Sequence, residues 1–324
     1  MLALGGTIAM AGTVGGGVAP ALSAEELLAA VPGLAGSGIE VRAAQFRQLP
    51  GASLSLADVL AASAEAAARL ADGADGVVVV QGTDTIEETA YLLELLHDGP
   101  RPIVVTGAMR NPTMAGADGP ANLDAAIRVA AADAASGLGC VVVLNDQIHA
   151  AARVAKTHTA NPAAFASPGA GPLGWIAEQS VHVVARPVRR RALPRPPGPI
   201  PPIGLYTVTL GDTGAALPAY AAAHAGLVVA AMGVGHVPVD LVEPLGEAAA
   251  RIPVVLASRT GAGSVHATTY GFAGSERDLL ARNLIGAGDR NPYQARILLG
   301  LLLATGADRK EIRVAFGGTA AFGA

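Results

Sequence analysis

The sequence places hydroxyl, carboxyl and amine groups in three short stretches where they could do chemistry together. These groups belong to Thr7 in GGTIA, Thr83 and Asp84 in QGTDT, and Lys156 in VAKT. A threonine hydroxyl becomes a nucleophile when a base removes its proton, and a carboxylate can hold that base in place. Lysine can act as the base when it is desolvated, whereas arginine stays charged. The three stretches therefore suggest hydroxyl-based catalysis.

The stretch QGTDT directly follows four valines, so we expect it to lie between a buried strand and a helix. Asp84 and Glu87 have the spacing of a capping box, which would explain one acid by helix stability alone. Capping does not explain two threonines behind Gly82, a residue type that lets the backbone approach a ligand closely. A helix N-terminus also favours anions such as a carboxylate. We favour a ligand site, with the helix cap as the alternative.

The other two stretches also have a functional and a structural interpretation. Behind GGTIA, the glycine-rich residues 12–20 could form a flexible lid over Thr7, or only an ordinary loop after a strand. No Lys-Ser/Thr pair follows these glycines, which argues against a phosphate-binding loop. Lys156 is one of two lysines in a chain that otherwise uses arginine, and its neighbours are mostly uncharged. We expect Lys156 to be partly buried for proton transfer, or else to pair with an aspartate.

Composition and spacing exclude several other classes of protein. With a net charge of −4, the chain has no general attraction for nucleic acid or anionic membranes. The seven histidines lack metal-ligand spacing, and the single cysteine, Cys140, lies in an apolar run where burial is expected. No uninterrupted apolar run reaches the roughly 18 residues of a membrane helix, and no secretory signal precedes GGTIA. We expect a cytoplasmic protein without metal or cofactor that acts on a small molecule.

Apolar runs alternate with amphipathic stretches, which predicts an α/β fold with a mainly parallel sheet flanked by helices. The predicted strands are residues 2–4, 39–46, 76–80, 102–106, 140–144, 203–208, 226–231 and 252–257, and the predicted helices are residues 24–30, 56–70, 86–96 and 122–132. Only residues 1–4 precede the first glycine, so we expect a marginal first strand and leave open a natural start upstream. Ligands of open parallel sheets bind at the carboxyl ends of the strands, where GGTIA, QGTDT and TGAMR are placed.

A change of composition at ARPVRRRALPRPPGPIPP divides the chain. Repeated prolines are incompatible with a helix or a central strand, so we predict a linker at residues 186–202. It would join an N-terminal catalytic α/β domain, 1–185, to a smaller C-terminal α/β domain, 203–324. The arginines in and beside this linker could bind an anion or a partner, but a solvated linker is the favoured interpretation. They are Arg186, Arg189, Arg190, Arg191 and Arg195.

The motifs resemble those of the bacterial-type L-asparaginases, in the asparaginase/glutaminase family. The matching segments, in chain order, are GGTIA at 5–9, QGTDTIEETAYLL at 81–93, TGAMR at 106–110, ADGPANL at 117–123, VAKT at 154–157, GPLGWI at 171–176 and NPYQARILL at 291–299. This order spans nearly the whole chain, and GGTIA with GTDTIEETA is highly specific. The resemblance implies hydrolysis of the side-chain amide of asparagine to aspartate and ammonia, with some activity on glutamine.

The resemblance also implies roles for individual residues. Thr7 would be the nucleophile. Thr83, Asp84 and Lys156 would form a second catalytic group, which helps to deprotonate a hydroxyl or a water molecule. Asp84 would also bind the α-ammonium of the substrate, and the backbone near Ala108 would contribute to an oxyanion hole. The expected substrate-binding residues are Gly6, Gly51, Ala52, Ser53, Gly82, Ala108 and Glu276. Family members are homotetramers built from dimers, with sites at subunit interfaces, and Glu276 aligns with a glutamate from the neighbouring subunit.

Three positions depart from the family pattern. The lid tyrosine that activates the hinge threonine is absent, because residues 10–31 contain no tyrosine and Gly17 or Val18 aligns there. Gly51 stands where the family has a serine that grips the substrate carboxylate, and Pro238 aligns near the family's asparagine after GVG. The Ser53 hydroxyl and the backbone N–H of Ala52 could bind the substrate carboxylate in place of that serine.

These departures leave several mechanisms open. Thr7 could be activated from the side of Thr83 and Lys156 or through a water, the lid could be remodelled and activity weak, or water could attack while Thr7 orients it. A non-catalytic amino-acid-binding homologue is the main alternative. A third interpretation is an amidase subunit of a larger complex, but such a subunit is expected to have an additional domain before GGTIA. Asparagine and glutamine differ by one methylene, worth only about 1–3 kcal/mol in a pocket, so the sequence does not separate them.

Overall fold

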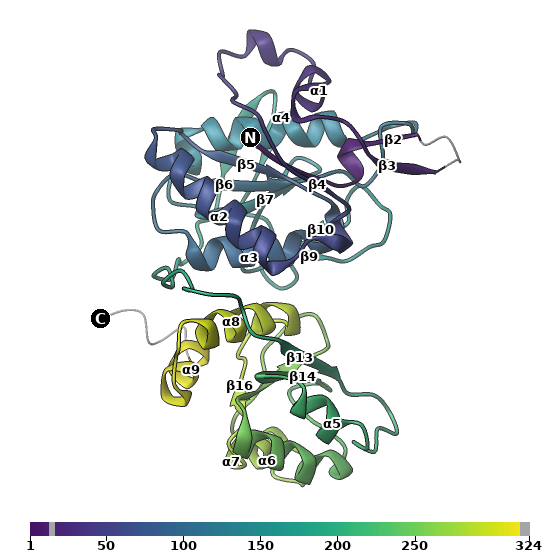
Figure 1. The fold of residues 1–324 in the computed structure, drawn as a ribbon, viewed down its shortest axis with the longest axis vertical. Helices are drawn as coiled ribbons and strands as arrows, with labels where there is room; N and C mark the ends of the chain where they lie inside the picture. Colours follow the sequence, from purple (N-terminus) through teal and green to yellow (C-terminus); the bar gives the residue numbers. More distant parts are fainter. Residues whose placement is uncertain (13–16, 318–324) are drawn as a thin grey trace. The chain divides into compact units, whose positions relative to one another are not determined.

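The computed structural model describes residues 1–12 and 17–317, which fall into two compact units, Met1–Ala192 and Leu193–Ala324 (Figure 1). Residues 185–202 contain neither helix nor strand, as the prolines predict. No helix of the described residues is long and apolar enough to cross a membrane. The same residues contain no group of histidine, cysteine and acidic side chains that could hold a metal ion.

The first unit is built on an eight-stranded sheet with the order β12-β11-β8-β7-β6-β5-β1-β4. Its strands are β1 Leu2–Gly5, β4 Ala44–Leu49, β5 Val77–Val80, β6 Ile103–Thr106, β7 Cys140–Leu144, β8 Gln147–Ala150, β11 Gly174–Ala177 and β12 Ser180–Val183. The pairs from β7 to β4 are parallel, and β8, β11 and β12 extend the sheet with antiparallel pairs. The carboxyl ends of the five parallel strands therefore lie at one edge of the sheet.

Helices cover both faces of this sheet (Figure 1). The helices α2, Leu56–Ala71, and α3, Ile86–Leu96, lie on one face, and α1, Ala24–Ala29, and α4, Gly119–Ala131, lie on the other. Side chains from α1 and α4 join the core formed on their face of the sheet. Serine side chains cap α1 and α2 through capping boxes, which satisfy amides of the first turn. Two short hairpins complete the unit: β2 Met10–Gly12 with β3 Val18–Pro20, and β9 Ala155–Lys156 with β10 Phe165–Ala166.

Some strand predictions for this unit need correction. The predicted strand at 39–46 is wrong in its bounds, because β4 runs Ala44–Leu49. The pairing partner explains the shift, since Leu2 at the start of β1 lies opposite Ala44, and earlier residues have no strand to pair with. The first strand is not marginal, because β1 pairs with both β4 and β5. The predicted flexible loop 12–20 falls partly on residues 13–16, outside the described residues.

Antiparallel strands β8, β11 and β12 were missing from the predicted elements. The turn between β7 and β8 is Asn145–Asp146, and both residues have φ near the left-handed region, at 50° and 57°. Glu178 and Gln179 make the corresponding turn between β11 and β12. Neither turn contains the glycine that usually marks such hairpins in a sequence, which is why the pattern was not recognised.

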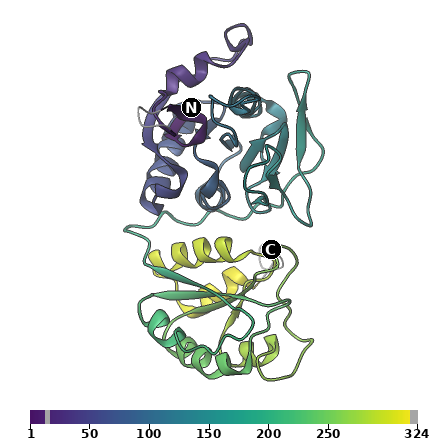
Figure 2. The same ribbon diagram turned by 90° about the vertical axis from the view of Figure 1, so that its right-hand side faces the viewer.

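The second unit has a parallel four-stranded sheet with the order β13-β14-β15-β16. Its strands are β13 Ile203–Thr207, β14 Gly226–Ala231, β15 Val254–Ser258 and β16 Ile285–Gly286, and its helices are α5 Leu217–Ala222, α6 Val242–Arg251, α7 Glu276–Ala281, α8 Pro292–Ala304 and α9 Arg309–Phe316. Helix α8 lies on one face of the sheet, and α5, α6 and α7 lie on the other (Figure 2). The predicted fold class, a larger mainly parallel α/β part followed by a smaller α/β part, is confirmed. The exact domain boundaries stay predictions.

The basic stretch after β12 is not simply solvated. The side chain of Arg189 is 19% exposed and donates hydrogen bonds to the carbonyl oxygens of His97 and Gly99. It also pairs with Glu94 at 3.3 Å. Arg186 donates to two carbonyl oxygens near the end of α4. Both arginines attach the stretch to the first unit. The interpretation as a solvated linker charge is wrong for Arg189, which is partly buried, whereas Arg186 is exposed.

Candidate functional site

Three loops that follow neighbouring strands touch through their glycines. Gly6 follows β1, Gly51 follows β4 and Gly82 follows β5. A Cβ atom at Gly82 would lie 2.6 Å from the backbone nitrogen of Gly51, and a Cβ at Gly6 would collide with the backbone of Gly82. Real Cβ contacts are not this short, so only glycine allows these backbones to meet. The glycines of GGTIA, LPG and QGTDT are therefore explained by a common contact.

Each of these loops continues into a short 3₁₀ turn that carries polar groups. The turns are Thr7–Ala9, Gly51–Ser53 and Thr83–Thr85. Thr83 is buried, Thr7 is partly buried, and Ala52 and Ser53 are exposed. Since Thr7 and Thr83 directly follow the touching glycines, Gly6 and Gly82, the chain brings their backbones to one place at the carboxyl edge of the sheet.

Lys156 reaches this place from the short strand β9. Its Nζ donates to Thr83 Oγ1 at 2.9 Å and to Asp84 Oδ1 at 2.7 Å. The lysine side chain is 16% exposed and that of Asp84 is 64% exposed. The amine is thus enclosed next to a buried hydroxyl, and one face of the carboxylate stays open to solvent. Such an arrangement can pass a proton between the hydroxyl and the amine while the carboxylate holds the amine in position.

The capping alternative for the acids of this turn is not what the structure shows. The N-cap of α3 is Thr85, and its side chain makes no capping hydrogen bond. Asp84 uses its carboxylate for Lys156 instead. Glu87 is partly buried, and burial followed by the charge of Glu88 raises its pKa to about 7, although a hydrogen bond from the Lys156 backbone N–H opposes this. Sequence reasoning treated Glu87 only as a capping residue.

Gln81 was not singled out from the sequence, yet it joins two of the turns. It is completely buried, and its Nε2 donates to Thr85 Oγ1 at 3.1 Å. The hydroxyl of Thr85 in turn donates to the carbonyl oxygen of Gly51 at 3.1 Å. This chain of hydrogen bonds fixes the Gly51–Ser53 turn against the turn that carries Thr83. The signal available in the sequence was a large amide side chain directly after a buried strand.

The loop after β6 packs against the same group. Ala108 is fully buried. A Cβ at the preceding residue, Gly107, would lie 2.5 Å from the carbonyl oxygen of Gln81 and 3.3 Å from Thr83 Cγ2. This close approach places the backbone around Ala108 beside Thr83. Four strand ends thus contribute to one site within the first unit.

Glu276 lies in the second unit and is closed to the outside. Its side chain is 0% exposed, and Oε1 accepts hydrogen bonds from the backbone N–H groups of Thr269 and Tyr270. His236 Nε2 lies 3.3 Å from Oε2. Burial alone would raise the pKa of Glu276, but these hydrogen bonds outweigh it and lower the pKa. The carboxylate is thus bound inside its own unit, and its expected contact with a substrate in a neighbouring subunit stays a prediction.

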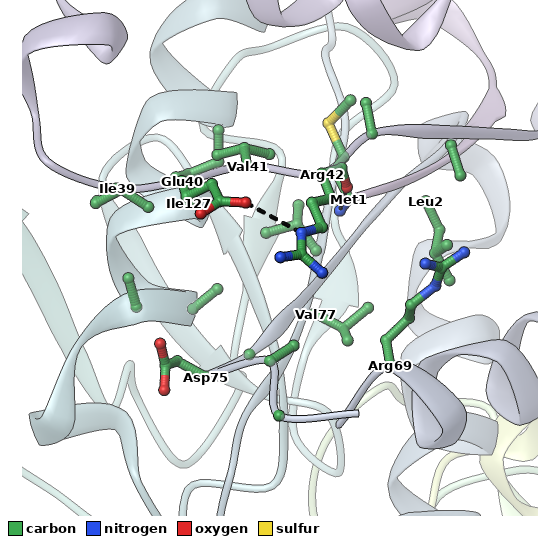
Figure 3. Close-up of a pocket in the computed structure, with 18 of the residues that line it drawn as sticks. Met1, Leu2, Ile39, Glu40, Val41, Arg42, Arg69, Asp75, Val77 and Ile127 are labelled. Atoms are coloured by element: carbon green, nitrogen blue, oxygen red, sulfur yellow. Dashed lines mark hydrogen bonds and ion pairs between the residues drawn. The ribbon is translucent and has the colours of Figure 1, made fainter. Parts of the chain in front are cut away.

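A separate cavity of about 560 Å³ lies at the other end of the first unit's sheet (Figure 3). It is lined by Val77 at the amino end of β5, whereas QGTDT follows the carboxyl end of that strand. Among the charged residues that line it, Arg42 binds Glu40 and Arg69 binds Glu65, whereas Asp72 and Asp75 form no ion pair within the part of the chain that the structure describes. We do not assign a function to this cavity.

Two family models match nearly the whole chain. "Asparaginase, N-terminal" matches residues 1–189, and "Glutaminase/Asparaginase C-terminal domain" matches residues 203–316. The chain therefore belongs to the asparaginase family.

Individual relatives agree with this assignment. The chain is 38% identical over 291 residues to a Deinococcus radiodurans protein named "Probable L-asparaginase", covering 89% of this chain and 88% of the relative. It is 33% identical over 330 residues to the "Glutaminase-asparaginase" of Pseudomonas aeruginosa, with 98% and 89% covered. The crystal structure of "Probable Cytoplasmic L-asparaginase" from Campylobacter jejuni superposes with a TM-score of 0.84 at 31% identity and covers 97% of both chains.

Proposed function

We propose that this protein hydrolyses L-asparagine to L-aspartate and ammonia. The observation that carries the proposal is the enclosed amine of Lys156, bonded at once to the hydroxyl of Thr83 and the carboxylate of Asp84. The names of the relatives point to the same amide substrate. A merely structural ion pair would not need a buried hydroxyl as the second partner of the amine.

The proposed reaction uses the hydroxyls of the two turns. Lys156 accepts a proton from Thr83, whose oxygen accepts a proton from the attacking group, Thr7 or a water. The attack forms a bond to the amide carbon, and the developing oxyanion is stabilised by backbone N–H groups such as that of Ala108. The proton then passes to the amide nitrogen, the C–N bond breaks and ammonia leaves. When Thr7 attacks, water hydrolyses the resulting ester by the same route.

The remaining substrate contacts follow from charge and exposure. Asp84 presents its open carboxylate face to the α-ammonium of the amino acid. The turn Gly51–Ser53 offers backbone N–H groups and the exposed Ser53 hydroxyl to the α-carboxylate. Gly6 and Gly82 supply close-packed backbone on the floor of the site. The N–H groups of the Gly51–Ser53 turn and the Ser53 hydroxyl would take the place of the serine that the family has at the position of Gly51.

Ammonia release by the purified protein tests the proposal. Lys156→Met is expected to lower kcat by about 10²–10⁴-fold, the contribution of a positioned proton acceptor. Its melting temperature should change little, since an ion pair to an exposed carboxylate is worth about 0–1 kcal/mol. The matched control is Lys310→Met, which removes the chain's only other lysine from an exposed position in α9. Equal activity of the two variants would contradict the proposed role.

The alternative of a non-catalytic binder has its own signature. Asparagine or aspartate would raise the melting temperature by mass action, while ammonia release stays at background for every variant. Such a result with the wild-type protein would overturn the enzymatic proposal. Comparing asparagine with glutamine in the same assay decides the substrate preference.

We also propose a homodimer or homotetramer located in the cytoplasm. Support comes from the family pattern for the assembly and from the Campylobacter jejuni relative, whose title describes it as cytoplasmic. Light scattering of the purified protein measures the oligomeric state, and a monomer with full activity would contradict the proposal that sites need two subunits.

A further inference from the structure

The buried backbone of Ala108 has unused hydrogen-bonding groups. Among the residues that the structure describes, neither its N–H nor its C=O has a hydrogen-bond partner, although the residue is 0% exposed. Buried backbone groups in proteins are nearly always paired, by protein, by water or by a ligand. One free N–H and one free C=O on a single residue match a primary carboxamide, which offers an acceptor oxygen and N–H donors.

Two side chains hold the peptide groups on either side of Ala108. Asn122 Nδ2 donates to the Gly107 carbonyl oxygen at 3.0 Å, and Asp118 Oδ2 accepts from the Met109 N–H at 3.0 Å. A peptide group is planar and trans, so its C=O and N–H point in opposite directions. Binding the Gly107 C=O on one side therefore directs the Ala108 N–H to the other side. In the same way, binding the Met109 N–H directs the Ala108 C=O away from Asp118.

The two side chains also support each other. Asn122 is 3% exposed, and its Nδ2 donates to Asp118 Oδ2 at 3.0 Å. Its Oδ1 accepts the N–H of Asn145 at 2.9 Å, which ties the loop after β7 to the same group. The second carboxylate oxygen of Asp118 accepts the N–H of Arg110 at 2.8 Å. Every polar atom of both side chains is engaged, so their positions are strongly determined.

Asp118 stands where a side chain normally caps a helix. It is the N-cap residue of α4, yet it makes no capping hydrogen bond. An aspartate cap typically contributes about 1 kcal/mol to helix stability. Here the carboxylate is directed to the loop after β6 instead, and helix stability alone does not explain this placement.

The start of α4 also contacts the other side of the site. A Cβ at Gly119 would lie 2.8 Å from Ile8 Cγ1 and 3.6 Å from the Cβ of Ala108. The glycine therefore lets the helix pack directly against the residue after Thr7 and against Ala108. The first turn of α4 therefore sets the position of Ala108 relative to Ile8, the residue after Thr7.

We propose that Asp118 and Asn122 are positioning residues that direct the C=O and N–H of Ala108 toward the carboxamide of the substrate. Asn122 orients the N–H, which faces the amide oxygen and the oxyanion formed from it. Asp118 orients the C=O, which faces the N–H groups of the amide. The inference rests on the proposed amide hydrolysis and adds two residues that do not touch the substrate.

The test measures kcat, KM and melting temperature for Asp118→Asn and Asn122→Ser. The matched control is His97→Phe, which removes a hydrogen bond from a buried ring to the Arg101 carbonyl near the amino end of β6, away from the site. Each test variant is expected to lower kcat by about 10-fold or more, somewhat less than the 10²–10³-fold loss seen when an oxyanion donor is removed outright. The control should keep kcat near the wild-type value at a similar loss of melting temperature.

A second substrate separates positioning from general damage. The β-methyl ester of aspartate has the carbonyl oxygen but no amide N–H, so it does not use the Ala108 C=O. Asp118→Asn should therefore lower kcat/KM more for asparagine than for the ester, whereas Asn122→Ser should affect both substrates alike.

The possible outcomes are distinct. Losses of kcat no larger than that of His97→Phe, or equal losses of Asp118→Asn on amide and ester, would overturn the inference, while ammonia release by the wild-type protein would leave the proposed function standing. If Asp118→Asn does not fold, the kcat of Asn122→Ser is compared with that of the control, and a loss no larger than the control's overturns the inference. A wild-type protein without ammonia release overturns both proposals.

Discussion

Replacing Glu87 by glutamine should stabilise the first unit, and the gain should grow as the pH rises. The pKa of Glu87 is raised from 4.5 to about 7, first by burial and second by the charge of Glu88. Between these two pH values the folded protein keeps a proton that the unfolded chain has released. The penalty for ionising the buried carboxyl is therefore absent below pH 4.5 and complete above pH 7. Glutamine keeps the shape of the protonated acid and never pays this ionisation cost.

The size of the effect follows from the two pKa values. A difference between 4.5 and about 7 corresponds to about 3 kcal/mol. Because the side chain is partly exposed, we expect about 1–3 kcal/mol of added stability for Glu87→Gln at pH 8. At pH 5 the two proteins should differ by only about 0.8 kcal/mol, because the folded wild type is still protonated at this position while the unfolded chain has released most of this proton.

Urea unfolding at several pH values measures this difference. The single tryptophan, Trp175, lies in the first unit together with Glu87, so its fluorescence follows the unfolding of that unit. Glu65→Gln is the control, because Glu65 forms an i,i+4 ion pair with Arg69 on the surface of α2 and should show little dependence on pH. A gain for Glu87→Gln that is constant with pH, or that is larger at pH 5 than at pH 8, would refute the reasoning.

Two further substitutions test the packing of the first unit. Gly82→Ala should lower the free energy of unfolding by about 1–3 kcal/mol and weaken activity, because its Cβ would lie too close to the backbone of Gly51. The control is Gly36→Ala, whose Cβ meets nothing within 4 Å and which should be close to neutral in the same urea assay. Arg189→Met should lower the stability of this unit by about 2–4 kcal/mol, because Glu94 is left buried without its charged partner. The control Arg191→Met changes an exposed arginine of the same stretch, and equal midpoints for both arginine variants would contradict the anchoring role of Arg189.

Local pattern was sufficient for much of the fold. Four valines predicted β5, and CVVVL predicted β7 with a buried Cys140, because continuous β-branched runs suit a strand that is covered on both faces. The same reasoning misplaced the strand at 39–46, whose bounds depend on the register of β1, a partner far away in the chain. Hairpin turns without glycine were also invisible, because their positive φ values are imposed by the strands on either side.

The chemical content of the site was determined by the sequence, while its arrangement was decided by the tertiary structure. The motifs GGTIA, QGTDT and VAKT supply the threonines, the aspartate and the lysine, and each motif is recognisable from a few consecutive residues. Lys156 and Thr83 are 73 residues apart, and only the packing of the β9–β10 hairpin against the turn after β5 brings the amine to the hydroxyl. The same holds for the pKa of Glu87 and for the two side chains beside Ala108, because burial and the direction of a peptide group are properties of the packed molecule.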